Sequence, residues 1–598
     1  MRHTKQTSLI RKLFKSSVVS LIVAVIATMV GVVIDGVVIS RALGPDAMAA
    51  YGLITPVVNM ASVFSGVLST GIQVVCAQHL GAGDAKSARR AFSMAMVVTL
   101  IVSALMLAGV LIFRTEIAVF LGARDASAHL LPYAKDYLLG VSFSLPLVIF
   151  LFEFNALMRL DGDANRVIIA VGTMTIADIA GDIINVTLIK GGMLGMGLAT
   201  SISYLLAGII MALHFAKKNI IFKPEFDKLK LKDLKDILTT GSSSAVGSAS
   251  GMMRNMVLNR LMVATALSAT ALSALSIMNT VLGFASCVLI GVGLTSSMVS
   301  GMILGDQDRK AAEELIKITT KTCLVIGIPM SVLVFVFANP IAKVFIDSSS
   351  PSTTPELVEL ATRALRFYSL SITLYGINNA FVNYTQGMRR MALSNAICFI
   401  QNFLFIALAA LALVKRFDAD AIWGAYVIGE TATLLTIIII SAIRYKTFPH
   451  RASDFLFLKE PFGAPEDEIF EVSLRSKEEV TAASQNVYEF CQRKSADSKS
   501  KVLLSLFVEE LGNNVAQFGF ANGEDRSLDI RVIHTENGWN LRLRDNCKAF
   551  DPTEWIKLHE DDDPTSNIGI RIVCGMAKDI SYLSTLDLNI LTIQITNS

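Results

Sequence analysis

Charged residues are scarce in this sequence for a chain of its length. Asp, Glu, Lys and Arg make up 17% of the 598 residues, whereas soluble proteins usually contain about a quarter. Hydrophobic residues make up 53%, which is too much for a soluble protein of this size. The shortage is uneven, because apolar runs fill residues 17–443 while the residues after them have an ordinary soluble composition. The sequence therefore predicts a membrane domain followed by a soluble domain.

Features of nucleic-acid-binding, zinc-binding and disulfide-linked proteins are also missing. The net charge is only +3 and no basic patch contains aromatic residues, so no nucleic-acid partner is expected. The seven cysteines are scattered without a Cys-x-x-Cys pair, which argues against a zinc site and against disulfides. Basic residues precede the first apolar run, but no small-residue cleavage site follows it. This run is therefore predicted to be a membrane-spanning helix rather than a signal peptide.

Runs of about 20 apolar residues, the length needed to cross a lipid bilayer, recur about twelve times. If the N-terminus is cytoplasmic, the inner loops hold roughly 25 Lys and Arg and the outer loops roughly ten, as the positive-inside rule requires. We therefore predict a multi-pass protein of the cell (inner) membrane with both termini in the cytoplasm. The predicted spans are residues 17–40, 51–77, 92–113, 133–157, 166–189, 194–215, 240–262, 268–299, 318–338, 365–386, 391–414 and 421–443.

The hydrophobic region contains an internal repeat. The stretch Val32–Arg90 is matched by Met252–Ala312, where Gly305-Asp306 stands in the place of Gly83-Asp84. The offset is about 225 residues and persists through the later spans, as expected of repeated structural units. Six spans per repeat give two lobes of the same orientation with a cavity between them. The predicted lobes cover residues 1–230 and 231–445.

Ionisable residues inside the predicted spans are candidates for transport. A charge at the bilayer centre costs at least about 2.5–3.5 kcal/mol, so such residues usually face a cavity. Asp35 lies deep in the first span, with a structural acid paired across helices as the alternative. Asp178, Asp182 and Asn185 share one face of the fifth span because they are spaced by four and three residues. They are predicted to bind a cation beside Asp35, or else to line a wet vestibule.

The second lobe has its own polar candidates for the substrate cavity. Arg254 aligns by the repeat with the depth of Asp35, so it is expected to face Asp35 across the cleft or to meet an anionic part of the substrate. Glu430 is the acid of the twelfth span. Asn378 and Asn379 of the tenth span are expected either to contact substrate or to hold helices together.

Several motifs of the membrane region resemble the multidrug and toxin extrusion (MATE) family. They are Asp35 followed by Arg41-Ala42-Leu43-Gly44, the segment Gln78–Asp84, and the segment Arg159–Asp163. The resemblance implies two six-helix lobes and cation-coupled efflux by alternating access, with Asp35 as the acid that binds Na⁺ or H⁺. In the members of the family that have a sodium or proton site, the fifth-span Asn is followed one turn later by an acid. Here Asn185 is followed by Ile189, so Asp182 is the expected substitute.

After a predicted linker at residues 446–466, residues 467–598 alternate helix and strand patterns. Strands are predicted at 469–474, 527–534, 539–544, 580–585 and 590–596, and helices at 476–493, 498–518 and 568–577. A capping box at Ser476–Glu479 would open the first helix. The fold class is thus an α-helical polytopic membrane protein with a C-terminal α/β sandwich of helices over a mostly antiparallel sheet.

The C-terminal domain resembles the ATP-binding domains of histidine kinases and anti-sigma-factor serine kinases. The resemblance rests on Glu510 and Asn514 one helical turn apart, on Asp545 after a strand, and on Gly569 at a helix start. It implies that Glu510 is the base, Asn514 the Mg²⁺ ligand and Asp545 the adenine contact. Gly569 would lie beside the ATP phosphates, and residues 553–566 would form the nucleotide lid.

This sequence departs from the kinase pattern at four positions. Cys547 and Ala549 replace the two glycines after the aspartate, and Asn567 replaces the first glycine of the phosphate motif. Phe518 stands where a histidine is frequent. Glycines at such positions let the backbone approach the nucleotide, so their loss weakens tight ATP binding. Both an ATP-binding serine-kinase-like domain and a degenerate regulatory module therefore stay open.

Together these patterns predict an exporter of small molecules, with cationic amphiphiles as the expected substrates and Na⁺ or H⁺ as the coupling ion. The tail would act as a regulatory domain with a cytoplasmic regulatory protein as its partner. Two alternatives remain. One is a flippase for lipid-linked precursors, for which Arg254 would contribute to a basic cavity. The other is a sensor whose membrane half binds a ligand and whose tail phosphorylates a partner.

Overall fold

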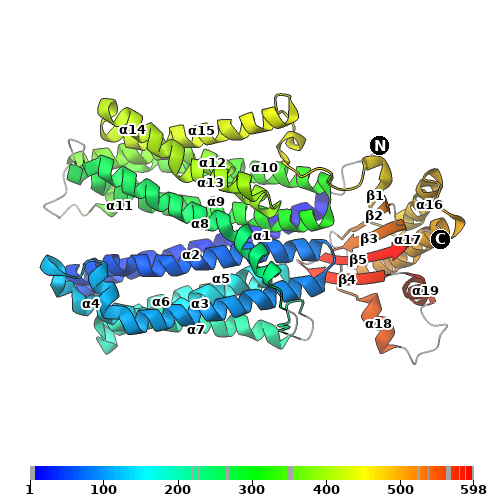
Figure 1. Cartoon of the computed structure of the whole chain (residues 1–598), viewed down its shortest axis with the longest axis horizontal. Coiled ribbons are helices and arrows are strands. Elements are labelled where there is room, and N and C mark those ends of the chain that lie inside the picture. The colour runs from blue at the N-terminus through cyan, green and yellow to red at the C-terminus, as the bar shows by residue number, and fades with distance from the viewer. Residues whose placement is uncertain are drawn as a thin grey trace.

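The protein combines a long bundle of helices with a small sheet domain at one end of the bundle (Figure 1). The computed structural model describes residues 7–217, 220–226, 229–263, 268–346, 355–520, 526–535, 538–559, 568–577, 579–585 and 588–595. The end of the bundle that meets the sheet domain is called the tail-facing end below.

The first lobe contains six segments that run along the bundle. They are α1 (Thr7–Val38) with the π-helical turn η1 (Ile39–Leu43), α2 (Pro45–Gly81), α3 (Ala85–Phe120), the pair α4 (Leu131–Ser142) and α5 (Ser144–Leu160), α6 (Ala164–Ile184) with η3 (Asn185–Ile189), and α7 (Gly192–Ala212). Short 3₁₀ turns, η2 (Asp125–Leu130) and η4 (Leu213–Ala216), lie at the ends.

The second lobe repeats this order. Its segments are α8 (Leu231–Val263), α9 (Ser268–Asp306), α10 (Arg309–Val336) with α11 (Ala338–Phe345), α12 (Pro355–Gly387), α13 (Met391–Phe399) running through η5 (Ile400–Leu404) into α14 (Phe405–Phe417), and α15 (Ala419–Tyr445).

The predicted membrane spans are present as helices. Among the described residues, nine helices are long and apolar enough to cross a bilayer, and α4 with α5, bent by 42°, makes a tenth span. Helices α8 and α12 have 33 residues each, which is long enough, but they are less apolar. Such helices suit positions where neighbouring helices rather than lipid cover them. With these two, each lobe has the six segments that the repeat predicts.

The repeat is offset by two residues from the alignment of Gly83-Asp84 with Gly305-Asp306. Asp84 caps α3 by accepting a hydrogen bond from Ser87 N at 3.0 Å, and Asp308 caps α10 by accepting one from Ala311 N at 3.0 Å. The residue before each cap has a positive φ, +76° at Gly83 and +53° at Gln307. The helix caps therefore equate Asp84 with Asp308, and Asp306 is left free for another role.

The two lobes pack closely along α2, α8 and α9 near the tail-facing end. A Cβ added at Gly71 of α2 would overlap the backbone carbonyl of Ile237 in α8, and one at Gly81 would overlap that of Met302 in α9. Glycine alone allows helix backbones to approach so closely. We call this contact the glycine seam; its other members are Gly241 and Gly305.

The tail folds as a five-stranded antiparallel sheet with strand order β1-β2-β3-β5-β4. The strands are β1 (Ile469–Leu474), β2 (Leu528–Thr535), β3 (Gly538–Asp545), β4 (Asp579–Thr585) and β5 (Leu588–Ile595). Helices α16 (Glu478–Arg493), α17 (Ser498–Gly519) and α19 (Ile568–Met576) lie on the side away from the membrane bundle (Figure 1). The predicted sandwich, with its strands and these three helices, is confirmed.

In the tail, one helix was not predicted and one local prediction is wrong. Helix α18 (Pro552–Leu558) was not expected; Asp551 caps it by accepting hydrogen bonds from Thr553 N and Glu554 N. The capping box at Ser476 does not form, because Glu479 accepts from Arg475 N at 2.7 Å instead. Asn567 and residues 560–566 of the predicted lid lie outside the described residues.

The segment predicted as a linker lies against the membrane bundle. It contains a short 3₁₀ turn, η6 (Ala452–Phe455), followed by the buried residues Leu456, Phe457 and Leu458. Tyr384 of α12 donates a hydrogen bond from its hydroxyl to Leu456 O at 3.0 Å. This part of the connection therefore contributes to the packed interior rather than acting as a loose tether.

Candidate functional site

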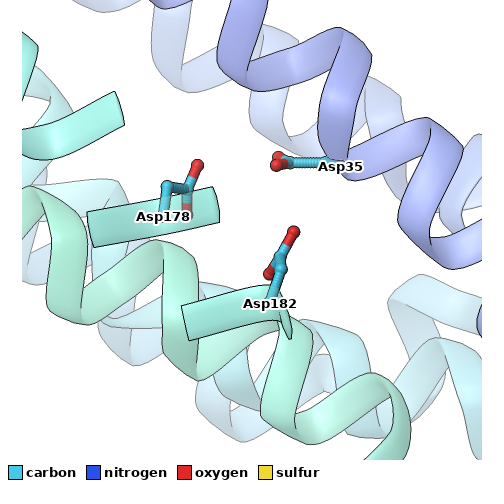
Figure 2. A group of neighbouring side chains, drawn as sticks. All are labelled: Asp35, Asp178 and Asp182. Atoms are coloured by element: carbon cyan, nitrogen blue, oxygen red, sulfur yellow. The ribbon is translucent and has the colours of Figure 1, made fainter. Parts of the chain in front are cut away.

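Three aspartates meet inside the first lobe. Asp35 comes from α1, and Asp178 and Asp182 come from α6, one turn apart; their carboxylates point toward one another (Figure 2). One oxygen from each lies within 4.8 Å of the others, and all three side chains are buried. The three acids therefore lie together, and their binding of a coupling cation stays a prediction. We call the three residues the carboxylate triad.

The carboxylate triad has few partners of its own. Ser203 of α7 donates to Asp178 Oδ1 at 3.3 Å. No hydrogen-bond donor among the described residues reaches Asp35 Oδ1 or either carboxylate oxygen of Asp182. Two negative charges 4.8 Å apart repel each other by about 3 kcal/mol at an effective dielectric of 20. The arrangement therefore favours a bound proton or a small cation, which would satisfy these oxygens and reduce the repulsion.

Asn185 serves the turn between α6 and α7 rather than the carboxylate triad. Its Oδ1 accepts from Gly191 N at 3.0 Å, and its Nδ2 donates to Gly192 O at 3.0 Å. A Cβ at Gly195 would overlap the Asn185 side chain. The amide thus holds the chain reversal that begins α7, the helix that carries Ser203.

A polar cluster occupies the interior of the second lobe. Glu430 of α15 is 3% exposed, and its Oε2 accepts hydrogen bonds from Asn378 Nδ2 at 2.8 Å and Gln401 Nε2 at 3.2 Å. Asn378 also donates to the Glu430 backbone carbonyl at 2.9 Å. These donors tie α12, η5 and α15 together. Asn379 packs against α9, since a Cβ at Gly293 would lie 2.7 Å from its Nδ2.

Arg254 and Asp35 form no ion pair, although the structure describes both. The Arg254 guanidinium lies over the ring of Tyr426 in its own lobe, 5.6 Å from the centroid. Its Nε donates a long hydrogen bond of 3.4 Å to its neighbour Asn255. A cation–π contact within the second lobe therefore holds the arginine, and its facing Asp35 across the cleft stays a prediction.

A cavity of about 340 Å³ lies between the first lobe and α9. Its lining is mostly apolar but includes Arg159, Gln73 and Asn155. Arg159 is 4% exposed, its Nη2 has no hydrogen-bond partner, and its Nε reaches only Ser20 Oγ at 3.4 Å. Arg159 belongs to the motif Arg159–Asp163, and no role was predicted for it. Because it lies just beyond the end of a predicted span, its enclosure by other helices was not predictable from the sequence.

Glu153 of α5 is a buried acid that the sequence analysis missed. It is fully buried and accepts a 2.5 Å hydrogen bond from Thr99 Oγ1 of α3. Its second carboxylate oxygen has no partner among the described residues. The signal was present, since Glu153 is the only acid in the second half of its predicted span, whereas Lys135 and Asp136 lie near the start. It was overlooked because no second acid lies near it in that half of the span.

The predicted nucleotide residues of the tail come from α17, α19 and the end of β3. Glu510 of α17 faces the start of α19, where a Cβ at Gly569 would overlap its carboxylate. Asn514 lies one turn further along α17 and is partly buried. Asp545 is buried and accepts hydrogen bonds from Asn589 Nδ2 and Cys547 N, each at 2.8 Å.

Burial sets the protonation of the groups around Asp545. It raises the pKa of Asp545, although hydrogen bonds from Asn589 and Cys547 oppose the rise. Burial and the charge of Asp545 together raise the pKa of Cys547 to about 12. Cys547 is therefore a neutral thiol at physiological pH. A Cβ at Gly519 would lie 2.5 Å from its sulfur, so this residue packs the end of α17 against β3.

Comparison with known proteins settles the class of the membrane part. The MatE family model matches residues 20–184 and 244–411, one segment in each lobe. The chain belongs to the MatE family. Among curated relatives of this MATE-type transporter is the probable multidrug resistance protein YoeA of Bacillus subtilis, 21% identical over 60% of this chain and 77% of that protein. Another is the multidrug export protein MepA of Staphylococcus haemolyticus, 23% identical over 68% and 88%.

Solved structures agree with this fold. An outward-facing multidrug resistance MATE family transporter of the MOP superfamily superimposes with a TM-score of 0.68 at 19% identity, over 75% of this chain and 99% of that one. A MOP superfamily transporter from Pyrococcus furiosus, described as having a binding pocket of reversed polarity, gives 0.66 at 21% identity, over 74% and 100%.

The tail matches a second family model. The histidine kinase-like ATPase domain model covers residues 475–595, which includes every strand except β1. The two matches together cover a large part of each membrane lobe and most of the tail. This MATE-type transporter therefore carries an ATPase-like domain fused to its second lobe.

Proposed function

We propose that this protein exports small organic molecules across the cell membrane by alternating access, driven by Na⁺ or H⁺ that binds at the carboxylate triad. The observation that carries the proposal is the set of triad oxygens that have no hydrogen-bond donor, held by α1 and α6 in the interior of one lobe. Multidrug functions printed for relatives such as YoeA and MepA support the same class of cargo.

The coupling would follow from charge. With the site empty, repulsion between Asp35 and the two acids of α6 favours their separation. A bound proton or Na⁺ removes that repulsion and draws α1 toward α6. A ligand shifts a conformational equilibrium only through its different affinity for the two states. Helix α1 packs against α6 and also against α9 of the other lobe. Movement of α1 relative to α6 would therefore change the arrangement of the lobes, and the two states would differ in their affinity for the ion.

The loop charges support an orientation with both termini and the tail in the cytoplasm. The tail-facing end would then be the cytoplasmic end. Substrate would bind between the lobes, and cationic amphiphiles are the expected class because buried carboxylates lie at Asp35 and Glu430. Arg254, Asn378 and Asn379 would shape the wall of the second lobe.

The test is efflux by purified protein in proteoliposomes under imposed Na⁺ or H⁺ gradients, with a fluorescent cationic dye as cargo. Asp35→Asn should reduce gradient-driven flux by at least tenfold. Glu116→Gln, which neutralises an exposed acid of α3, is the matched control and should behave as the parent protein. Undiminished gradient-driven flux in Asp35→Asn would eliminate the triad as the coupling site.

Anionic amphiphiles, including lipid-linked precursors, are a second candidate cargo. The supporting observation is Arg159, a buried guanidinium in a mostly apolar cavity whose lining contains no acid. A buried cation without a counter-ion is costly, so a ligand carboxylate or phosphate would be stabilised there. Flux of an anionic and a cationic dye, compared in parent protein and Arg159→Gln, separates the two. Selective loss of anionic-dye flux would favour the second cargo.

For the tail we propose a nucleotide-responsive regulatory role, in which Asn514 binds Mg²⁺, Glu510 orients water, Asp545 contacts adenine and Gly569 lies beside the phosphates. A cytoplasmic protein is the expected partner. Binding of a fluorescent ATP analogue with Mg²⁺ to the full-length protein, with and without Asn514→Ala, tests this role. Equal binding by both proteins would remove Asn514 from the site, and absence of binding would leave a degenerate module.

A further inference from the structure

The sheet of the tail has two different faces. Alternate residues of each strand point to the helices α16, α17 and α19, where Leu541, Leu543 and Leu591 form an apolar core. The other face is turned toward the membrane bundle (Figure 1). That face carries Glu471 of β1, Asp529 and Arg531 of β2, and Arg542 and Arg544 of β3, which are paired in register.

Part of this face meets the loop between α9 and α10 of the second lobe. Arg531 forms an ion pair with Asp308 at 3.0 Å, and both side chains are nearly fully buried. Arg542 pairs with Asp306, the acid that the helix cap leaves free, and lies 3.7 Å from Asp308. Lys310 reaches back to Glu471 at 3.5 Å. Charges of opposite sign thus match across the contact, and burial keeps salt from screening them.

Another part of the same face meets the first lobe. Leu583, Leu588 and Ile590 of β4 and β5 are buried in the same apolar cluster as Leu160 at the end of α5. Thr585 donates a hydrogen bond to the backbone carbonyl of Leu160. Ser581 faces the loop between α2 and α3, since a Cβ at Gly83 would lie 3.4 Å from its hydroxyl.

We propose that the ATPase-like domain is a clamp that holds the two lobes together at the tail-facing end. One sheet grips the α9–α10 loop of one lobe through charge and the α5 end of the other through apolar burial. The contact lies directly beyond the glycine seam, where the lobes are already closed. Opening this end requires the lobes to separate, so the sheet must release at least one of its two contacts first. The domain therefore restrains the state that is open toward the tail.

The proposal rests on alternating access as proposed above. Its test must be separable from the test of transport, and it therefore uses neither substrate nor an ion gradient. Val74 of α2 is fully buried, and a Cβ at Gly301 of α9 would lie 3.0 Å from its backbone carbonyl oxygen at the seam. In a full-length background with the seven native cysteines replaced, Val74→Cys should react with a maleimide only when the seam opens. Its labelling rate in proteoliposomes measures opening directly.

Arg542→Glu should raise the labelling rate at least tenfold, and the charge swap Arg542→Glu with Asp306→Lys should bring it back to within threefold of the parent. Arg493→Glu makes the same charge change on exposed α16 and should leave the rate unchanged. The proposal is overturned by a rate in Arg542→Glu within twofold of the parent, or by a raised rate that the charge swap does not reverse. Loss of dye flux in Asp35→Asn bears on coupling alone and does not affect this result.

Discussion

Asp182 is placed where stability and the proposed cation site conflict. Both of its carboxylate oxygens are buried without a donor, beside two other acids. An unpaired buried carboxylate is costly, and functional sites commonly reduce stability in this way. The spacing of Asp178 and Asp182 made their shared face predictable. That Asn185 would turn away to hold the α6–α7 turn was not predictable, because its partners at residues 191 and 192 lie beyond the helix.

Asp182→Asn should therefore stabilise the protein while it impairs coupling. Neutralising one acid removes its repulsion with whichever neighbouring carboxylate is ionised, so the free energy of unfolding should rise, by up to about 3 kcal/mol for each charged pair that is lost. Thermal unfolding in detergent at pH 7.5 measures the change, with Glu116→Gln as control. A lower melting temperature for Asp182→Asn would show that the carboxylate has a structural partner.

Gly31 should limit access to the same site. A Cβ at this position of α1 would lie 3.8 Å from Asp178 Oδ2, which is ordinary contact distance. Gly31→Ala should therefore retain ion-driven flux, whereas Gly31→Leu should fill the space between α1 and α6 and reduce flux at least tenfold. Flux under a Na⁺ or H⁺ gradient decides this, and equal flux in both variants would contradict it.

At the scale of elements, the helices followed from local patterns and their contacts did not. Apolar length predicts a span, and the repeated order of polar loops predicts two lobes. The glycine seam depends on which face of α2 meets α8 and α9, and residues such as Gly71 and Ile237 are too far apart in the chain for any local pattern to pair them. Helix α18 was missed because a single Asp-Pro cap starts a helix of only seven residues.

The seam gives a matched pair of substitutions on α2. Gly71→Ala places a methyl group against the Ile237 carbonyl, whereas a Cβ at Gly66 would lie 3.6 Å from Ser244 and fits. Overpacking of this kind typically costs about 1–3 kcal/mol. Here it would destabilise the conformation that is closed at the tail-facing end. Maleimide labelling of Val74→Cys should accelerate in Gly71→Ala and not in Gly66→Ala. Equal rates would mean that the helices adjust without separating.

At the scale of the molecule, the association of the tail with the bundle was not predictable from sequence. Arg542 and Arg544 alternate along one strand, which indicates a charged sheet face, but nothing local says that Asp306 and Asp308 will meet it. The connection between the parts was likewise expected to be only a linker. Buried Leu456, Phe457 and Leu458 instead fix it to the bundle.

This packing predicts resistance to proteolysis. Lys459 directly follows the buried residues, so trypsin should cleave there slowly in the native protein, since cleavage requires local unfolding. Phe457→Asp would bury a charge and should expel the segment, with cleavage accelerated at least tenfold. Lys459→Gln in the same variant should abolish the new fragment. Rapid cleavage in the parent protein would contradict the packed arrangement.

Fusion of the tail to α15 fixes the number of ATPase-like domains per transporter. A domain that is part of the same chain meets its partner surface without any change in expression. If the sheet restrains opening as proposed, each transporter carries its own restraint in a fixed one-to-one ratio, and the contact between the sheet and the bundle need not be strong. A modest signal can release a weak contact between the sheet and the bundle. The rate of export would then change without synthesis or degradation of the transporter.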